Sequence, residues 1–306
     1  MELLAQAAIG FLAGLLGGLL GIGGSVIIIP ALIVYLSHTT SGYTGNVQHL
    51  LQAAAMICNV FVAAPSLTAH YRAGAIMKSV VTVLVPTALV GIFLGVAASN
   101  SSSFARQNGV YLAMILAGFL AYVAVYNTWR MFSATDLTRQ FDDSRKLPAW
   151  RVALVGLPMG FAGGLLGIGG GAICVPMQQI ILRVPLRKAI ANSAATIVCV
   201  ASIGALYKNL TLPSHGIAVV ASLKLALMLI PTAIVGSYLG GKLTHALPRK
   251  LLRVVFVVFM AAIAYLTFSK AWKAASTPRL PPPGQSTGVR AEAGFSATSS
   301  PGRPVR

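Results

Sequence analysis

The chain has 306 residues, of which 56% are hydrophobic and only 9% are charged, and its mean hydropathy is +0.80. Soluble domains carry about 25% charged residues, so this composition excludes an ordinary water-soluble protein. The net charge of +18 comes from 23 Lys and Arg against five acids, but most basic residues lie between apolar segments or near the C-terminus. That distribution is typical of the positive-inside rule and predicts a polytopic membrane protein without a nucleic-acid partner.

Eight apolar segments follow one another along the chain. They cover residues 4–36, 47–68, 76–98, 109–128, 151–182, 189–207, 217–240 and 251–269. We expect all of them to be helical, because their apolar runs are continuous rather than alternating and lipid cannot satisfy exposed backbone groups. Glu2 precedes the first segment without any Lys or Arg, so we interpret this region as a membrane segment rather than a signal peptide. The predicted fold class is all-α.

The segments divide into two groups of four. We predict a first repeat over residues 1–129, a polar linker over 130–150, a second repeat over 151–270 and a tail over 271–306. The linker holds three of the five acids. The tail is rich in Pro, Gly and Ser and poor in large apolar residues, a composition that predicts disorder.

Two motifs indicate that the groups are copies of one unit. GGLLGIGGSVIIIP at 17–30 and GGLLGIGGGAICVP at 163–176 are identical at ten of fourteen positions, with an offset of 146. PTALVGIFLG at 86–95 matches PTAIVGSYLG at 231–240, with an offset of 145. Two independent motifs at nearly the same spacing predict an internal duplication.

The first segment of each repeat is interrupted by glycines. Both segments exceed 30 residues, although about 20 residues cross a bilayer. Each glycine costs a helix about 1 kcal/mol relative to alanine, so a cluster of them predicts a break. Breaks at membrane depth occur where helix N-termini present their positive dipole ends to an anion. The candidate backbone ligands are Gly21, Gly23, Gly24, Gly167, Gly169, Gly170 and Gly171.

Close helix packing is the alternative explanation for these glycines. The Gly14-x-x-x-Gly18 and Gly160-x-x-x-Gly164 spacings are typical of helices in close contact, and we expect packing at those four positions.

The charge distribution favours a re-entrant first segment in each repeat. If every segment crossed once, the basic loops of the second repeat would lie on the opposite face from the basic linker. If segments 4–36 and 151–182 enter and return, all basic loops share one face and the repeats are inverted in the membrane. Eight plain crossings with parallel repeats remain the alternative.

Few side chains within the apolar segments suggest chemistry. No Asp or Glu follows Glu2 in any of them, which favours an anionic or neutral substrate and argues against an enzyme. Gln52, Asn192 and Ser193 are the candidate side-chain ligands, because amides and hydroxyls can bind an oxyanion. Polar bridging between helices is the alternative role for them.

Other polar residues receive structural interpretations. We expect Arg72 and Lys208 to anchor at the membrane interface, with an entry funnel for the substrate as the alternative. We expect His49 to be structural or interfacial. The three cysteines are expected to be small buried residues, because none has metal-ligand spacing. No metal or cofactor is predicted.

The glycine motifs, the HYRAG sequence at 70–74 and the paired PTA-x-VG sequences resemble the TauE/SafE family of sulfite-exporter-like permeases. The resemblance covers roughly residues 5–270. It implies a multi-pass carrier of the bacterial inner membrane with about eight helices. It also implies a sulfur-containing anion, such as sulfite or a sulfonate, as substrate. The chain departs from the family at Leu51-Gln52, where relatives often show Thr-Ser or Thr-Asn.

Together these observations predict a secondary transporter of a small organosulfur or sulfur oxyanion, working by alternating access in a lipid bilayer. An anion channel with the same site and a membrane accessory protein without transport activity are the alternatives. Homo-oligomerisation is left open.

Overall fold

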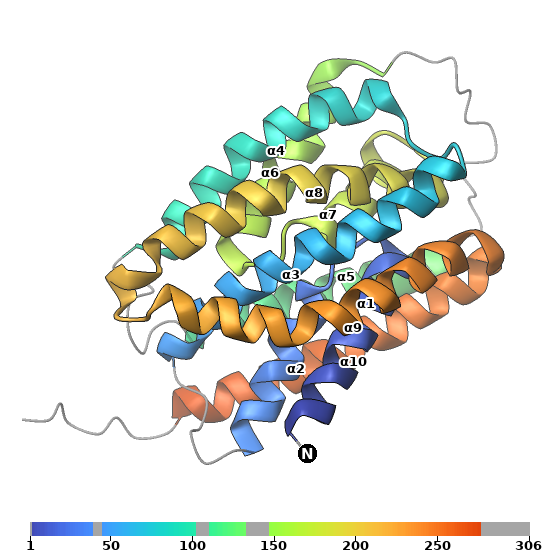
Figure 1. Ribbon diagram of the computed structural model, residues 1–306. Helices are drawn as coiled ribbons and strands as arrows, with labels where there is room; N and C mark the ends of the chain where they lie inside the picture. The colour runs from blue at the N-terminus through green and yellow to red at the C-terminus, as the bar shows by residue number, and fades with distance from the viewer. Residues whose placement is uncertain (1, 39–44, 102–109, 133–146, 277–306) are drawn as a thin grey trace, which may run out of the picture. The chain divides into compact units, whose positions relative to one another are not determined.

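A computed structural model describes residues 2–38, 45–101, 110–132 and 147–276, and every regular element within these ranges is a helix (Figure 1). The elements are α1 (Glu2–Leu20), α2 (Ser25–His38), α3 (Gly45–Arg72), α4 (Lys78–Ser99), α5 (Val110–Phe132), α6 (Ala149–Leu166), α7 (Gly171–Ile181), α8 (Leu186–Thr211), the 3-10 helix η3 (Leu212–His215), α9 (Val219–Ala246) and α10 (Arg249–Ser276). Most of the predicted linker and the predicted disordered tail lie outside the described residues.

Five helices in the described part of the chain are long and apolar enough to cross a membrane. They are α3, α4, α6, α8 together with η3, and α9. Large apolar side chains on their outer faces are exposed, including Leu227, Val235 and Phe93. Such exposure would be costly in water, but hydrocarbon solvates these side chains, so these faces suit contact with lipid.

The two glycine clusters lie between pairs of helices. Residues 21–24 separate α1 from α2, and residues 167–170 separate α6 from α7. Five glycines there have φ between 64° and 81°: Gly21, Gly23, Gly167, Gly169 and Gly170. Residues with a Cβ rarely adopt this left-handed conformation, so glycine lets the chain leave one helix and start the next within four residues.

Helices from different repeats pack in matched pairs. Gly14 of α1 lies against the Ala233 carbonyl of α9, and Gly160 of α6 lies against the Ala88 carbonyl of α4. The two contacts correspond under the repeat offsets of 146 and 145. The Gly-x-x-x-Gly spacing therefore marks close helix packing, as predicted, and each packed pair joins one helix from each repeat.

The same contacts give the directions of neighbouring helices. Along α1, Gly10 meets Thr232 and Gly18 meets Ser237 further along α9, so these helices run parallel. On the matching pair, Gly156 meets Thr87 and Gly164 meets Ile92, so α6 and α4 also run parallel.

The corresponding helices α3 and α8 run in opposite directions. His49 near the start of α3 contacts Lys208 near the end of α8, and Met56 approaches Gly204. The antiparallel crossing places the two equivalent helices side by side, with the glycine clusters against them.

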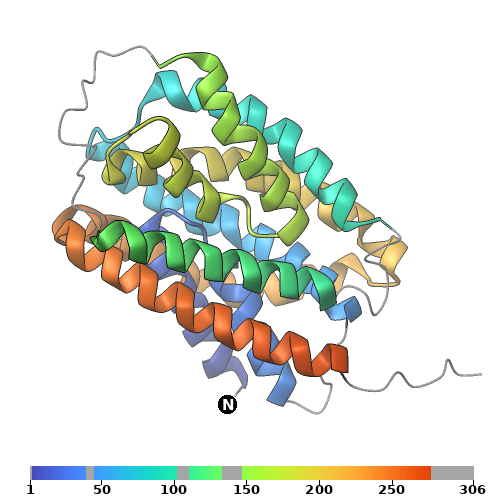
Figure 2. The same ribbon diagram turned by 180° about the vertical axis from the view of Figure 1, so that it is seen from behind.

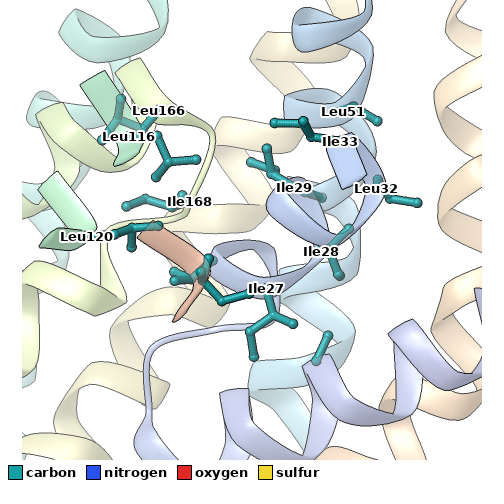
Figure 3. Close-up of a cluster of buried hydrophobic side chains, with 14 of the residues drawn as sticks. Ile27, Ile28, Ile29, Leu32, Ile33, Leu51, Leu116, Leu120, Leu166 and Ile168 are labelled. Carbon is teal, nitrogen blue, oxygen red and sulfur yellow. The ribbon is translucent and has the colours of Figure 1, made fainter. Parts of the chain in front are cut away.

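Two apolar clusters fill the interior. One gathers α2, α5 and both glycine segments, and Figure 3 shows Ile27, Ile29, Leu116 and Ile168 within it. The other gathers α4, α6, α7 and α8. Helices α5 and α10, which Figure 2 shows from behind the view of Figure 1, both contribute side chains to the first cluster. These clusters fix the helices that carry the polar residues described next.

Candidate functional site

Asn59 of α3 lies between the two glycine segments, residues 21–24 and 167–170. It bonds to Ser25, which directly follows the first segment, and to Ile168 within the second. Its Oδ1 accepts the Ser25 N–H at 2.8 Å, and its Nδ2 donates to Ser25 Oγ at 2.6 Å. The same Nδ2 donates to the Ile168 carbonyl at 3.0 Å. A single buried amide therefore joins the start of α2 to the segment that precedes α7, which makes this point the centre of the candidate site.

Asn59 is not among the residues predicted from the sequence to be ligands. It lies seven residues after Gln52, on the same face of α3, so helical periodicity was the signal that could have found it.

Gln52 and Ser193 occupy matching places, each contacting the glycine segment of the opposite repeat. Gln52 Nε2 on α3 donates to the Leu165 carbonyl at 3.2 Å. Ser193 Oγ on α8 donates to the Gly21 carbonyl at 2.7 Å. Both predicted side chains thus lie at the glycine segments and hold backbone carbonyls that a continuous helix would have bonded.

One polar atom at this position has no protein partner. Gln52 Oε1 is buried and has no hydrogen bond to any part of the chain that the structure describes. An unpaired buried acceptor is costly, and it suits an O–H donor such as water or a protonated oxyanion.

Asn192 has a different position from the other two predicted side chains. Its Oδ1 accepts the Met77 N–H at 2.8 Å, and its Nδ2 donates to Gln178 Oε1 at 2.9 Å. These bonds link α8 to the residue before α4 and to α7. Asn192 therefore bonds to a different set of residues from Asn59.

The glycine segments touch each other as well as α3 and α8. A Cβ on Gly171 would lie 2.5 Å from the Ile22 carbonyl, and one on Gly169 would lie 2.5 Å from Asn59 Nδ2. A Cβ on Gly24 would meet Val62 at 2.9 Å. Close packing therefore accompanies the breaks in the two glycine segments.

Basic and aromatic residues surround a cavity at the C-terminal ends of α3 and α9. The cavity has a volume of about 300 Å³ and is lined by Ala69, Arg72, Ala73, Tyr238, Lys242 and His245. Behind it, His70 Nδ1 lies 3.0 Å from His245 Nε2. The positive charges of Arg72 and Lys242 attract anions to this cavity.

Two expectations about single residues are wrong. Lys208 is completely buried rather than anchored at the interface, and its Nζ contacts Ser99 and Asn100 besides His49. Cys199, expected to be buried, is exposed on α8. The lysine is buried because α3 and the end of α4 pack against the last turns of α8 and cover its side chain.

No group of three or more His, Cys, Asp or Glu residues able to hold a metal ion occurs among the described residues. The donors at the centre are amides, a hydroxyl and backbone groups, which are neutral and suit an oxyanion or a neutral ligand.

The apolar helices, the repeated architecture and the polar centre define a multi-pass helical protein of the cell membrane. The family model described as sulfite exporter TauE/SafE matches residues 6–267. The chain therefore belongs to the TauE/SafE family, as its motifs suggested.

Several curated relatives support this assignment. The chain is 30% identical to the probable membrane transporter protein MamO of Paramagnetospirillum magneticum over 82% of the chain and 42% of that protein. It is 26% identical to the probable membrane transporter protein YunE of Bacillus subtilis over 87% of the chain and 96% of that protein. The relatives are named as transporters, not as enzymes.

The chain spans less than half the length of the MamO relatives, including the one from Magnetospirillum gryphiswaldense, of which it covers 44% at 29% identity. No solved structure matches the chain.

Proposed function

We propose that the protein is a secondary transporter that moves a small anion across the membrane by alternating access. Family membership and the names of the relatives support transport as the activity. The observation that carries the proposal is the buried amide of Asn59, which bonds to Ser25 at the start of α2 and to Ile168 in the second glycine segment, in a protein with five candidate spans. Paired interruptions of this kind are where secondary transporters bind substrate.

The substrate class follows from the chemistry of the site. Amide N–H, hydroxyl and helix N-terminal N–H groups can surround the oxygens of an oxyanion, whereas a cation would favour a carboxylate. No Asp or Glu lies between Glu2 and Asp136 or between Asp143 and Glu292. The family description points to sulfite, and a sulfonate or related organosulfur anion presents the same pattern of oxygens.

We assign Gly21, Gly23, Gly24, Gly167, Gly169, Gly170 and Gly171 as backbone ligands, with Gln52, Asn192 and Ser193 as polar side chains of the site. Gln52 is supported by its bond to Leu165 in the last turn of α6 and its packing against Gly167, and Ser193 by its bond to the Gly21 carbonyl. Asn192 acts indirectly, because its side chain bonds to Gln178 and thereby positions α7.

Inverted repeats provide the alternating access. Helices α1, α9 and α3 share one direction, since Ser237 meets Val62 and His245 meets His70 along α9 and α3. Helices α6, α4 and α8 share the opposite direction, since Ile92 meets Gly204 and Ser99 meets Lys208. These directions support repeats of opposite orientation, in which α1–α2 and α6–α7 each enter and return.

The proposal is tested by anion flux in proteoliposomes. Purified protein should take up labelled sulfite saturably, and sulfite on the opposite side should stimulate the uptake. Saturation with trans-stimulation indicates a carrier, while flux that neither saturates nor responds to trans substrate indicates a channel.

Matched variants locate the site. Gly169→Leu should abolish flux, because the new side chain collides with Asn59. Gly118→Leu on α5 is the control, since nothing lies within 4 Å of its added Cβ, and it should leave flux unchanged. Normal flux in correctly folded Gly169→Leu would contradict a substrate site at the second glycine segment.

A further inference from the structure

A second polar cluster lies at the end of α8, away from the glycine segments. It consists of Lys208 and its neighbours His49 on α3, Ser99 and Asn100 at the end of α4, and His215 in η3. We call it the Lys208 cluster. None of the residues that the structure places around the lysine is acidic, although burying an unpaired ammonium costs several kcal/mol. The cluster is therefore not an ordinary buried ion pair.

The hydrogen-bond network around Lys208 can serve both the ammonium and the neutral amine. The Nζ atom lies 2.5 Å from Ser99 Oγ, 2.8 Å from Asn100 Oδ1 and 3.0 Å from His49 Nδ1. As an ammonium it donates to all three atoms. As an amine it donates to Asn100 Oδ1 and one other atom, and it accepts from the Ser99 hydroxyl or from His49 Nδ1–H.

The orientation of Asn100 is fixed by its own partners, so its oxygen remains an acceptor in both states. Its Nδ2 donates to Thr211 Oγ1 at 2.8 Å, while Thr211 donates to backbone carbonyls one turn earlier. Only a hydroxyl rotation or a histidine tautomer change is needed to exchange the two states of Lys208. The cluster can thus gain or lose a proton without moving its heavy atoms.

The cluster also connects the buried lysine with the outside of the bundle. The imidazole of His215 is half-buried, and its Nε2 lies 3.2 Å from Asn100 Oδ1. Its ring stacks on that of His49, with centroids 3.9 Å apart and planes 12° apart. Two stacked imidazole rings therefore extend from Lys208 toward the end of the helix.

Helix α8 links the cluster to the candidate transport site. Ala201 on α8 lies beside Gly169, and Lys208 follows seven residues later, a distance of about 10 Å along the helix. Ser193, which holds the Gly21 carbonyl, is on the same helix. A movement of α8 against α3 and α4 would alter both sites, because both are built from contacts between these helices.

We propose that the Lys208 cluster binds a proton and couples anion movement to a proton gradient. This inference rests on the proposed function, which supplies the transported anion. The apolar segments after Glu2 contain no carboxylate that could bind a coupling proton, and the Lys208 cluster would bind it instead.

The first test uses methanesulfonate, an anion that stays ionised across the working pH range and carries no proton itself. Proteoliposomes with a pH difference of one unit should accumulate the labelled anion about tenfold if one proton moves with each anion, because one pH unit equals 1.36 kcal/mol. A pH-sensitive dye inside the vesicles should report matching proton entry. Membrane potential is clamped with valinomycin and potassium.

The variants separate coupling from transport. Lys208→Met and Lys208→Arg should lose the tenfold accumulation while keeping exchange of labelled for unlabelled anion, because neither side chain gains and loses a proton. Lys224→Met is the control, since Lys224 is exposed on α9, and it should accumulate like the unaltered protein. Accumulation driven by the pH difference in Lys208→Met would overturn the proposal.

A second measurement needs no substrate. Protein labelled with ¹⁵N-histidine is titrated between pH 5 and 9 in detergent, and the midpoints of His49 and His215 are followed. Lys208→Met should change these midpoints, because it removes a neighbouring charge, and Lys224→Met should not. Histidine midpoints that are unchanged by Lys208→Met would contradict a proton site shared by these residues. If the midpoints change but the protein transports no anion, the substrate assignment fails and the proton site stands.

Discussion

Alanine at Gly169 should destabilise the protein far more than alanine at Gly74, although the two glycines have nearly the same backbone, with φ of 66° and 62°. A Cβ in this left-handed conformation costs about 1–2 kcal/mol. At Gly74 nothing lies within 4 Å of the new Cβ, so this is the whole penalty. At Gly169 the new Cβ would lie 2.5 Å from Asn59 Nδ2.

The additional penalty at Gly169 comes from a broken hydrogen bond. Asn59 must turn away from the new methyl group, which leaves the buried Ile168 carbonyl without its donor. An unpaired buried group adds about 1–3 kcal/mol, so Gly169→Ala should cost about 2–5 kcal/mol in total.

Thermal unfolding of purified protein in detergent measures the difference. In a chain of this size each kcal/mol lowers the midpoint by about 2 °C, so Gly74→Ala should shift it by about 2–4 °C and Gly169→Ala by about twice as much or more. Sulfite flux should fall in Gly169→Ala alone. Equal shifts in the two variants would refute the idea that Asn59 holds the glycine segments together.

Three further outcomes are expected. Ser193→Ala removes the donor to the Gly21 carbonyl and should reduce flux, whereas Ser202→Ala, whose hydroxyl bonds within its own helix, should not change the flux assay. Asn59→Asp places a carboxylate between the glycine segments and should lower anion flux at least about tenfold. In a background without native cysteines, Ala73→Cys and Ser214→Cys should label from opposite membrane faces; labelling from one face would contradict inverted repeats.

The helices could be predicted because their signals are local. Apolar runs and glycine clusters each appear within a single stretch of sequence, and segments 4–36 and 151–182 each form two helices around their glycines. The partners of Gly14 and Gly160 could not be predicted, because Gly-x-x-x-Gly spacing indicates close packing without saying which helix approaches.

The parts that sequence analysis missed depend on residues far apart in the chain. Lys208 near a helix end resembles the many lysines that reach the interface, and it is buried by residues far away in the sequence, His49 on α3 and Ser99 and Asn100 at the end of α4. In the sequence, Asn59 is a single polar residue on an apolar helix. Its partners Ser25 and Ile168 lie next to it only in the folded protein. The tertiary fold creates these partners, so local patterns carry no trace of them.

The most direct test of the account is to locate a bound anion. Selenite resembles sulfite in shape and charge, and its selenium can be located by anomalous diffraction in crystals of the protein. The account predicts a selenium peak beside Asn59, between residues 21–24 and 167–171. A peak confined to the basic cavity at Arg72 and Lys242, with none beside Asn59, would contradict an anion site built from the two glycine segments.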